Sequence, residues 1–262
     1  MHGRRMLFAA VMVPGLAQAG AWTQPAGEGL AISSASLGVA PVLATANPAG
    51  DREDSFTSVY LEYGLVEGLT LGATMFAEVA TQARTDHTAS AGLFLRKRVW
   101  QGDRGGVVSV QAGGVHPIDG LFGPQFGGAG AEPTKEVSLR LLYGRGFGGA
   151  WGTAFLSTET GFHRQLNAEP DAWRLDLTAG FAPDPCCLMM LSAYTSVTPS
   201  DSGSSSLKLA PSVAYTFGAG EEPDADAEDA PGQPVTLQLG LLQDVLDLGA
   251  GFGVQVSIWR PF

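Results

Sequence analysis

Only two of the 262 residues are cysteines, and they are adjacent, at Cys186 and Cys187. Two cysteines cannot supply the framework of bridges that stabilises small exported domains. Adjacent strand residues point to opposite faces of a sheet, so a bridge between these two would strain the backbone. The sequence therefore predicts two free thiols embedded in a strand, with a strained disulfide between neighbours as the alternative.

Long apolar runs and positive charge are also scarce. No run of about twenty apolar residues, the length that a membrane-spanning helix needs, follows residue 19. Lys and Arg number 15 against 26 Asp and Glu, and the formal net charge is −11. A surface that binds nucleic acid needs the opposite balance, because it must neutralise phosphates. These deficits exclude a helical membrane protein and predict no nucleic-acid partner.

Histidine is rare as well, with four in the chain. His87, His116 and His163 follow residue 19, and none has the spacing of a metal-ligand motif, so the sequence predicts no metal site and no cofactor. His87 with Ser90 is the best pair of a base and a hydroxyl, but the two lie on opposite sides of an alternating strand. We interpret the three histidines as solvated loop residues and predict no catalytic residue and no enzyme.

The first 19 residues have the organisation of an export signal. "MHGRR" is short and positive, "MLFAAVMVPGLA" is apolar, and "AQA" ending at Ala19 fits a small-x-small cleavage site. Pro14 interrupts the apolar stretch, which is too short for an uncleaved membrane helix. We therefore expect residues 1–19 to be a cleaved signal peptide, and residues 20–29 to be a periplasmic N-terminal segment.

What the chain has in abundance is alternation. In "DAWRLDLTAGF", Trp173, Leu175 and Leu177 fall on one face, whereas Arg174 and Asp176 fall on the other. Helical spacing fits such windows less well. Twelve segments of this kind lie between turn signals: 30–44, 55–65, 69–81, 88–100, 106–115, 135–145, 150–163, 171–182, 186–198, 205–217, 234–245 and 249–262.

Many of these segments exceed the nine to eleven residues with which a tilted strand crosses a bilayer. Backbone groups in lipid must all pair internally, so such strands must close into a barrel. The sequence predicts an all-β fold: a closed antiparallel up-and-down transmembrane β-barrel of about 12 strands, formed by residues 30–262. A soluble exported β-sandwich is the alternative.

The links between segments support this architecture. Those after the second, fourth, sixth and eighth segments are short, whereas several of the others are longer, as in outer-membrane barrels. The acidic stretch Glu221 to Asp229 breaks this rule, because it falls on the short-turn rim. We interpret it as a solvated acidic loop, with cation collection as the alternative.

Aromatic residues stand near the lower end of every descending segment, if both termini are periplasmic. Aromatic rings favour the headgroup level of a membrane, so we predict that these residues form a girdle. The predicted girdle consists of Tyr63, Trp100, Tyr143, Phe181, Phe217 and Trp259, with Phe262 at the end of the chain.

The last strand resembles the terminal β-signal of Gram-negative outer-membrane proteins, in which a final aromatic residue follows apolar residues at alternate positions. The residues that carry this resemblance are Phe252, Val254, Val256, Ile258 and Phe262. It implies recognition by the outer-membrane assembly machinery and a location in the outer membrane. "AWTQPAGEG", "YLEYGLVEGLTLGA" and "SIWRPF" further resemble a group of poorly characterised proteobacterial outer-membrane proteins, some of which are described as transporters near aromatic-degradation genes.

Alternation also assigns charged residues to the interior of the barrel. The predicted lumen-facing residues are Glu62, Glu78, Arg96, Arg98, Arg140, Glu159, Arg174, Asp176 and Lys208. Twelve strands lie between filled eight-stranded barrels and open sixteen-stranded pores. We therefore expect a channel or facilitator for small solutes in outer-membrane lipid. A plugged barrel with a structural, adhesion or assembly role and a lipid-acting enzyme are the alternatives.

Overall fold

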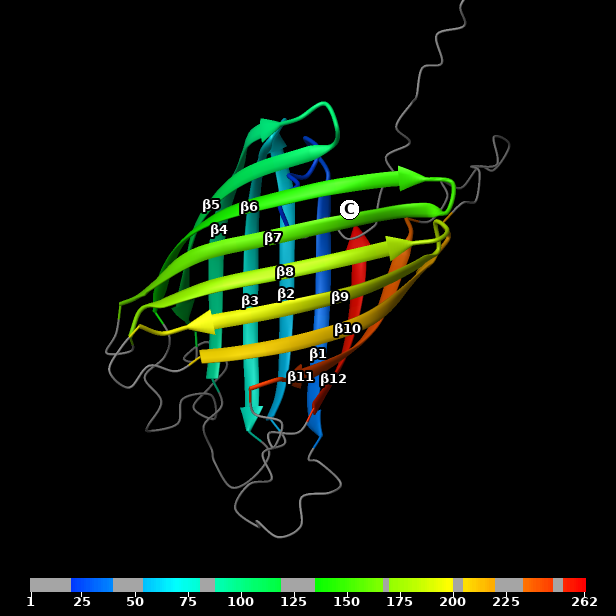
Figure 1. Ribbon diagram of the computed structural model, residues 1–262. Coiled ribbons are helices and arrows are strands. Elements are labelled where there is room, and N and C mark those ends of the chain that lie inside the picture. Colours follow the sequence, from blue (N-terminus) through cyan, green and yellow to red (C-terminus); the bar gives the residue numbers. More distant parts are fainter. Residues whose placement is uncertain are drawn as a thin grey trace, which may run out of the picture.

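The structure is a computed structural model, and it describes residues 20–39, 54–80, 88–118, 135–166, 170–199, 205–219, 233–246 and 252–262. Within these ranges, twelve strands form one closed barrel (Figure 1). The strands are β1 (Gly29–Val39), β2 (Asp54–Val66), β3 (Leu69–Ala80), β4 (Thr88–Gln101), β5 (Gly106–Pro117), β6 (Glu136–Gly149), β7 (Gly152–Gln165), β8 (Ala172–Ala182), β9 (Cys187–Val197), β10 (Ser205–Phe217), β11 (Val235–Asp244) and β12 (Phe252–Pro261).

Each strand pairs antiparallel with its neighbours in the chain, and β1 pairs with β12 to close the sheet. The seam ends in two backbone hydrogen bonds: the N–H of Gly29 donates to the carbonyl of Phe262 at 2.8 Å, and the N–H of Phe262 donates back at 3.0 Å. A closed sheet has no unpaired edge, which is what a hydrocarbon environment demands. The predicted fold class is confirmed.

The outward face of the barrel is apolar. Along β6, Val137, Leu139 and Leu141 are exposed, whereas Glu136 and Leu142 on the other face are buried. On a water-soluble protein, so large an apolar surface would be an aggregation site, but around a closed barrel it is the surface that lipid covers. The chain therefore has the fold of an outer-membrane β-barrel protein. Among the described residues, no helix is long and apolar enough to cross a membrane.

Most of the predicted girdle lies on this outward face, but Trp259 does not. Its side chain is 5% exposed and packs inside the barrel with Leu30 of β1. The alternation along β12 explains the difference, because Ile258 and Phe262 point outward and Trp259 lies at an odd position between them. The prediction of Trp259 as a girdle residue is therefore wrong.

A β-bulge decides the direction of Trp100. The register between β4 and β5 shifts between Arg98 and Trp100, so that Val99 has no partner. The extra residue reverses the alternation, and Trp100 is exposed on the same outward face as Val99. The other predicted girdle residues are exposed without such a shift: Tyr63, Tyr143, Phe181, Phe217 and Phe262.

Cys186 and Cys187 are free thiols, as predicted. Only Cys187 lies in a strand, at the start of β9; both backbone N–H groups donate to Asp184 Oδ1 in the preceding turn, each at 2.8 Å. The acidic stretch and His87 lie outside the described residues.

Candidate functional site: the barrel lumen

Residues 20–24 lie inside the end of the barrel at which β1 begins and β12 ends, called the periplasmic end below, and residues 25–28 lead from there to β1 (Figure 1). The sequence predicts a periplasmic segment that precedes the barrel, but it does not predict that this segment enters the lumen. In the structure Ala21, Thr23 and Gln24 are buried, whereas Pro25 and Glu28 are exposed. The chain therefore turns back from β1 into its own lumen.

Hydrogen bonds from several strands hold this N-terminal segment. Ser109 Oγ on β5 donates to the carbonyl of Ala21 at 2.5 Å. The backbone N–H of Gln24 donates to Thr70 Oγ1 on β3 at 2.8 Å, and its side-chain amide donates to Glu62 Oε2 on β2 at 2.7 Å. Backbone groups that would otherwise be buried without partners are thus satisfied by the barrel wall.

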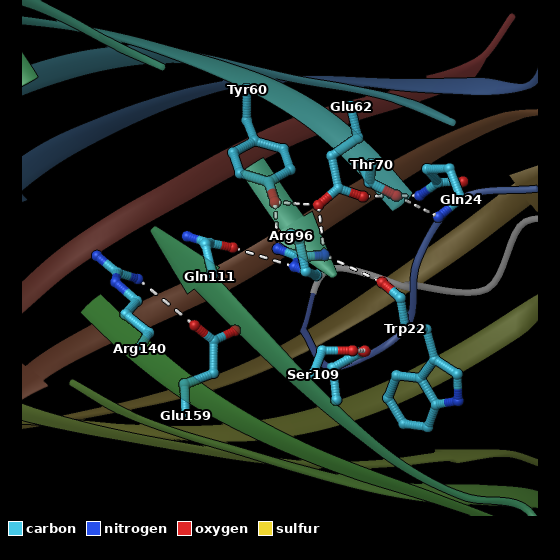
Figure 2. Close-up of polar contacts among 11 residues, drawn as sticks. Trp22, Gln24, Tyr60, Glu62, Thr70, Arg96, Ser109, Gln111, Arg140 and Glu159 are labelled. Carbon is cyan, nitrogen blue, oxygen red and sulfur yellow. Dashed lines mark hydrogen bonds and ion pairs between the residues drawn. The ribbon is translucent and has the colours of Figure 1, made fainter. Parts of the chain in front are cut away.

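Arg96 on β4 is the centre of this polar contact (Figure 2). Its Nη1 lies 2.6 Å from Glu62 Oε1 and donates to the carbonyl of Trp22 at 3.0 Å. Its Nη2 donates to the hydroxyl of Tyr60 and its Nε donates to Gln111 Oε1, both at 3.0 Å. Arg96 and Glu62 are 2% and 1% exposed, so this is a buried ion pair. Such a pair is tolerated because hydrogen bonds surround it.

Glycines on the neighbouring strands leave the space that these contacts need. Glu62 and Arg96 come from β2 and β4, and β3 lies between them with Gly72 opposite Glu62 and Thr70 opposite Arg96. A Cβ on Gly72 would overlap the ring of Phe94 on β4. A Cβ on Gly144 of β6 would lie 2.7 Å from the Trp22 ring. Glycine at these positions leaves the space that the larger side chains occupy.

The opposite side of the lumen is apolar at the same end. Its buried core comprises Leu30, Ala182, Leu188, Met190, Ala214 and Trp259, with Ile32 and Phe155 packed against it. Trp22 joins the two sides, because its ring meets that of Phe155 edge-on at 6.1 Å between centroids. The polar network, the N-terminal segment and this apolar cluster together fill the periplasmic end.

Further along the lumen, charged groups lie in a looser arrangement. Arg140 Nη1 on β6 and Glu159 Oε2 on β7 are 3.4 Å apart (Figure 2). Glu159 is directly opposite Asp176 on β8, so two carboxylates face the lumen side by side. Like charges at directly opposed positions repel each other.

A third group lies on the lumen face near the extracellular ends of β6, β7 and β8. His163 is fully buried, and its Nδ1 is 2.5 Å from Glu136 Oε1. A carboxylate only accepts, so Nδ1 carries the proton. Gln165 Nε2 and Arg174 Nη2 contact Glu136 Oε2 at 3.1 and 3.4 Å. The interpretation of His163 as a solvated loop residue is therefore wrong. His116 also lies in a strand, at the exposed end of β5.

Replacing Glu136 with Ala should lower the free energy of unfolding by about 2–3 kcal/mol. The substitution leaves the buried His163 without its partner and removes the acceptor of Gln165 and Arg174. The midpoint of urea unfolding in lipid vesicles measures the effect. Glu67→Ala is the matched control, because Glu67 pairs with Arg98 at the surface. Equal midpoints for the two variants would contradict a structural role for Glu136.

The structure brings some of the predicted lumen residues together and leaves others apart. Glu62 pairs with Arg96, and Arg140 with Glu159, whereas Arg98 pairs at the periplasmic mouth with Glu67, which was not predicted. Lys208 is exposed on the inner face of β10. The side chain of Glu78 lies outside the described part of the structure.

Sequence reasoning missed several contributors to the lumen, among them the N-terminal segment, Tyr60, Glu136 and His163. Tyr60 was detectable, because it alternates with Glu62 and so shares its face. His163 was detectable in the same way, two alternations beyond Glu159. Among the described residues, no group of three His, Cys, Asp or Glu could hold a metal ion.

No protein-family model matches the chain, and no curated protein matches its sequence. Among solved structures, the COG4313 outer membrane channel from Pseudomonas putida F1 has a TM-score of 0.61 at 10% identity, covering 95% of this chain and 100% of that one. CdiB from Acinetobacter baumannii has a TM-score of 0.39 at 8% identity, covering 90% and 60%. OmpT of Vibrio cholerae, with loop L8 deleted, has a TM-score of 0.34 at 8% identity, covering 90% and 98%. The first likeness shows a shared barrel fold, and the other two are too weak for any conclusion.

Proposed function

We propose that this barrel is a passive channel for small polar solutes and that its own N-terminal segment closes it at the periplasmic end. The observation that carries the proposal is the position of residues 20–24, which lie inside the lumen and are held there by side chains of β2 to β5. A closure made from a chain terminus can leave the lumen without breaking the barrel.

Exposure along the lumen supports this view. Inward-facing side chains are buried at the periplasmic end, for example Thr70, Ser109 and Leu142. Toward the other end, Tyr194 is 41% exposed and Lys208 is exposed as well. The lumen is thus filled where the N-terminal segment lies. Beyond it, the lumen face is accessible to water along β9 and β10, whereas Glu136 and His163 are buried on β6 and β7. The solved channel with the same fold supports the proposal by analogy only.

Charges of both signs line the accessible part, among them Arg174, Asp176 and Lys208. Opposite charges facing one another across a narrow passage favour small polar or ionic solutes over large apolar ones. A permanently plugged barrel with a structural, adhesion or assembly role is the alternative. We propose no catalytic role, because among the described residues no hydroxyl lies within hydrogen-bond distance of His163 Nε2.

The same proposal includes the route of the protein. Residues 1–19 direct export and are removed, and the outer-membrane assembly machinery recognises the last strand. The residues that carry this recognition are Phe252, Val254, Val256, Ile258 and Phe262, all of which point outward from β12. Outer-membrane lipid then surrounds the apolar face.

Planar-bilayer recording of the folded protein, produced without residues 1–19, tests the channel. We expect brief openings of low conductance, because the closed state dominates while the N-terminal segment is in place. A gel shift on heating verifies that each sample is folded. Complete absence of current, both from this protein and from a folded variant that lacks residues 20–27, would overturn the proposal in favour of a permanently plugged barrel.

A further inference from the structure

Gly20 lies buried in the lumen beside β7. A Cβ on Gly20 would overlap Ser157 Oγ and would lie 3.9 Å from Glu159 Oε1. The nitrogen and the Cβ of a residue are both bonded to Cα, about 2.5 Å from each other. The nitrogen of Gly20 is therefore within about 6.5 Å of the Glu159 carboxylate, by the same geometry.

The acidic and polar groups around this nitrogen are only partly paired. Ser157 Oγ is buried and has no hydrogen-bond partner. Glu159 and Asp176 are directly opposed, and Arg140 is the one cation within ion-pair distance of either carboxylate among the described residues. Arg140 pairs with Glu159, and among the described residues Asp176 has no cation within ion-pair distance. An unpartnered hydroxyl and a carboxylate without a direct counter-charge therefore mark a place suited to a cationic donor.

We propose that the α-ammonium group of Gly20, created by cleavage after Ala19, binds Ser157 Oγ and the Glu159–Asp176 carboxylate pair and anchors the N-terminal segment in the lumen. In that step a signal peptidase adds one water across the Ala19–Gly20 amide bond. The water oxygen goes to the acyl carbon, which leaves as the Ala19 carboxylate. The nitrogen keeps its single amide proton and takes both protons of the water, giving Gly20 –NH₃⁺. The inference rests on the proposed closure of the lumen by this segment.

The geometry gives the amine a role that an internal amide cannot have. An α-amino group is largely protonated at neutral pH, and it offers three donors where the uncleaved amide offers one. Opposite charges within such a separation attract each other, and the attraction grows as water is displaced from between them. Closure of the lumen therefore depends on processing, because the precursor carries no charge at Gly20.

A double-mutant cycle between the amine and Glu159 tests this anchor. Chains produced with Gly20 directly after the initiating Met lose that Met and expose the Gly20 amine. Nα-acetylation by a co-expressed acetyltransferase keeps the Gly20 nitrogen but removes its charge. The cycle combines acetylation with Glu159→Gln and measures the unfolding equilibrium in vesicles. Glu28→Gln is the matched control, because the Glu28 side chain is exposed at the other end of the segment.

We expect acetylation and Glu159→Gln to destabilise the protein separately and to show a coupling of about fivefold or more in the unfolding equilibrium when combined. The Glu28→Gln effect should add independently to that of acetylation. Additive effects of acetylation and Glu159→Gln would overturn the anchor. The mass of protein exported by a Gram-negative host should correspond to a chain that begins at Gly20, and a different first residue would overturn it equally.

Neither measurement detects ion flux, so the two proposals can fail separately. If acetylation and Glu159→Gln are coupled but planar bilayers show no current, the anchor proposal stands and the channel proposal is wrong. If the protein conducts but the effects of acetylation and Glu159→Gln on unfolding are additive, the channel proposal stands and the anchor proposal is wrong.

Discussion

Deleting residues 20–27 from the processed chain should convert a channel that opens briefly into one that conducts persistently. The deletion removes Trp22 and Gln24, together with four hydrogen bonds that join residues 21–24 to the barrel wall. Hydrogen bonds of this kind contribute about 1 kcal/mol each. A closed state favoured by about 4 kcal/mol is open for about 0.1% of the time, so the mean current should rise by roughly a thousandfold.

Planar-bilayer recordings of the two proteins at equal insertion measure this difference. Glu28→Gln is the control, because it alters an exposed side chain of the same segment and should leave the mean current unchanged. The heat-dependent gel shift shows whether the shortened chain still forms a barrel. If the shortened barrel is folded and its current equals that of the parent, the N-terminal segment does not close the lumen.

Arg96→Met should destabilise the barrel by about 3–5 kcal/mol. It leaves the Glu62 carboxylate buried without its counter-charge, which is the costly way to disrupt a buried ion pair. It also removes the donors to the Trp22 carbonyl, Tyr60 and Gln111. The midpoint of urea unfolding in vesicles should fall accordingly. Because Trp22 loses its tie to the wall, the mean current should rise in the same variant.

Two further variants separate charge from packing. Arg98→Met is the control, because Arg98 pairs with the exposed Glu67 and should contribute less than about 1 kcal/mol. Combining Glu62→Gln with Arg96→Met removes both charges and should recover a part of the lost stability. If the double variant is no more stable than Arg96→Met, an unpaired carboxylate is not the cause of the loss.

The architecture could be predicted because a strand repeats every two residues and membrane strands have two very different faces. Alternation alone assigned Glu62, Arg96 and Glu159 to one face of their strands. It could not show that Glu62 meets Arg96, because that contact spans β3 and depends on two registers. Ion-pair partners in a barrel are set by strand-to-strand register, which a single sequence does not contain.

Two aromatic residues show where alternation must be applied with care. Trp259 was placed in the girdle although Phe262, three positions away, has the opposite parity and points outward. Consistent counting along β12 would have placed Trp259 inside. Trp100 is the converse case, because counting along β4 places it inside and the bulge at Val99 turns it outward. Bulges leave no reliable trace in the sequence.

The position of residues 20–28 was beyond reach for a different reason. The segment has no alternation, and its contacts are made largely by backbone groups, such as the N–H of Gln24 and the carbonyls of Ala21 and Trp22. Because backbone groups are nearly the same in every residue, the residue types of a sequence do not indicate which partners those groups will bind. The available hints were an isolated Trp22 and small residues on the facing strands.

The junction of Gly29 with Phe262 makes the closing segment a tethered ligand. Residues 20–28 are joined directly to β1, which is hydrogen-bonded at the seam. A released flexible chain of this length would extend about 17 Å from its attachment point. Its effective concentration at the lumen would be in the millimolar range. Reclosing is therefore unimolecular, so dilution of the protein in the membrane would not shift the balance between open and closed barrels.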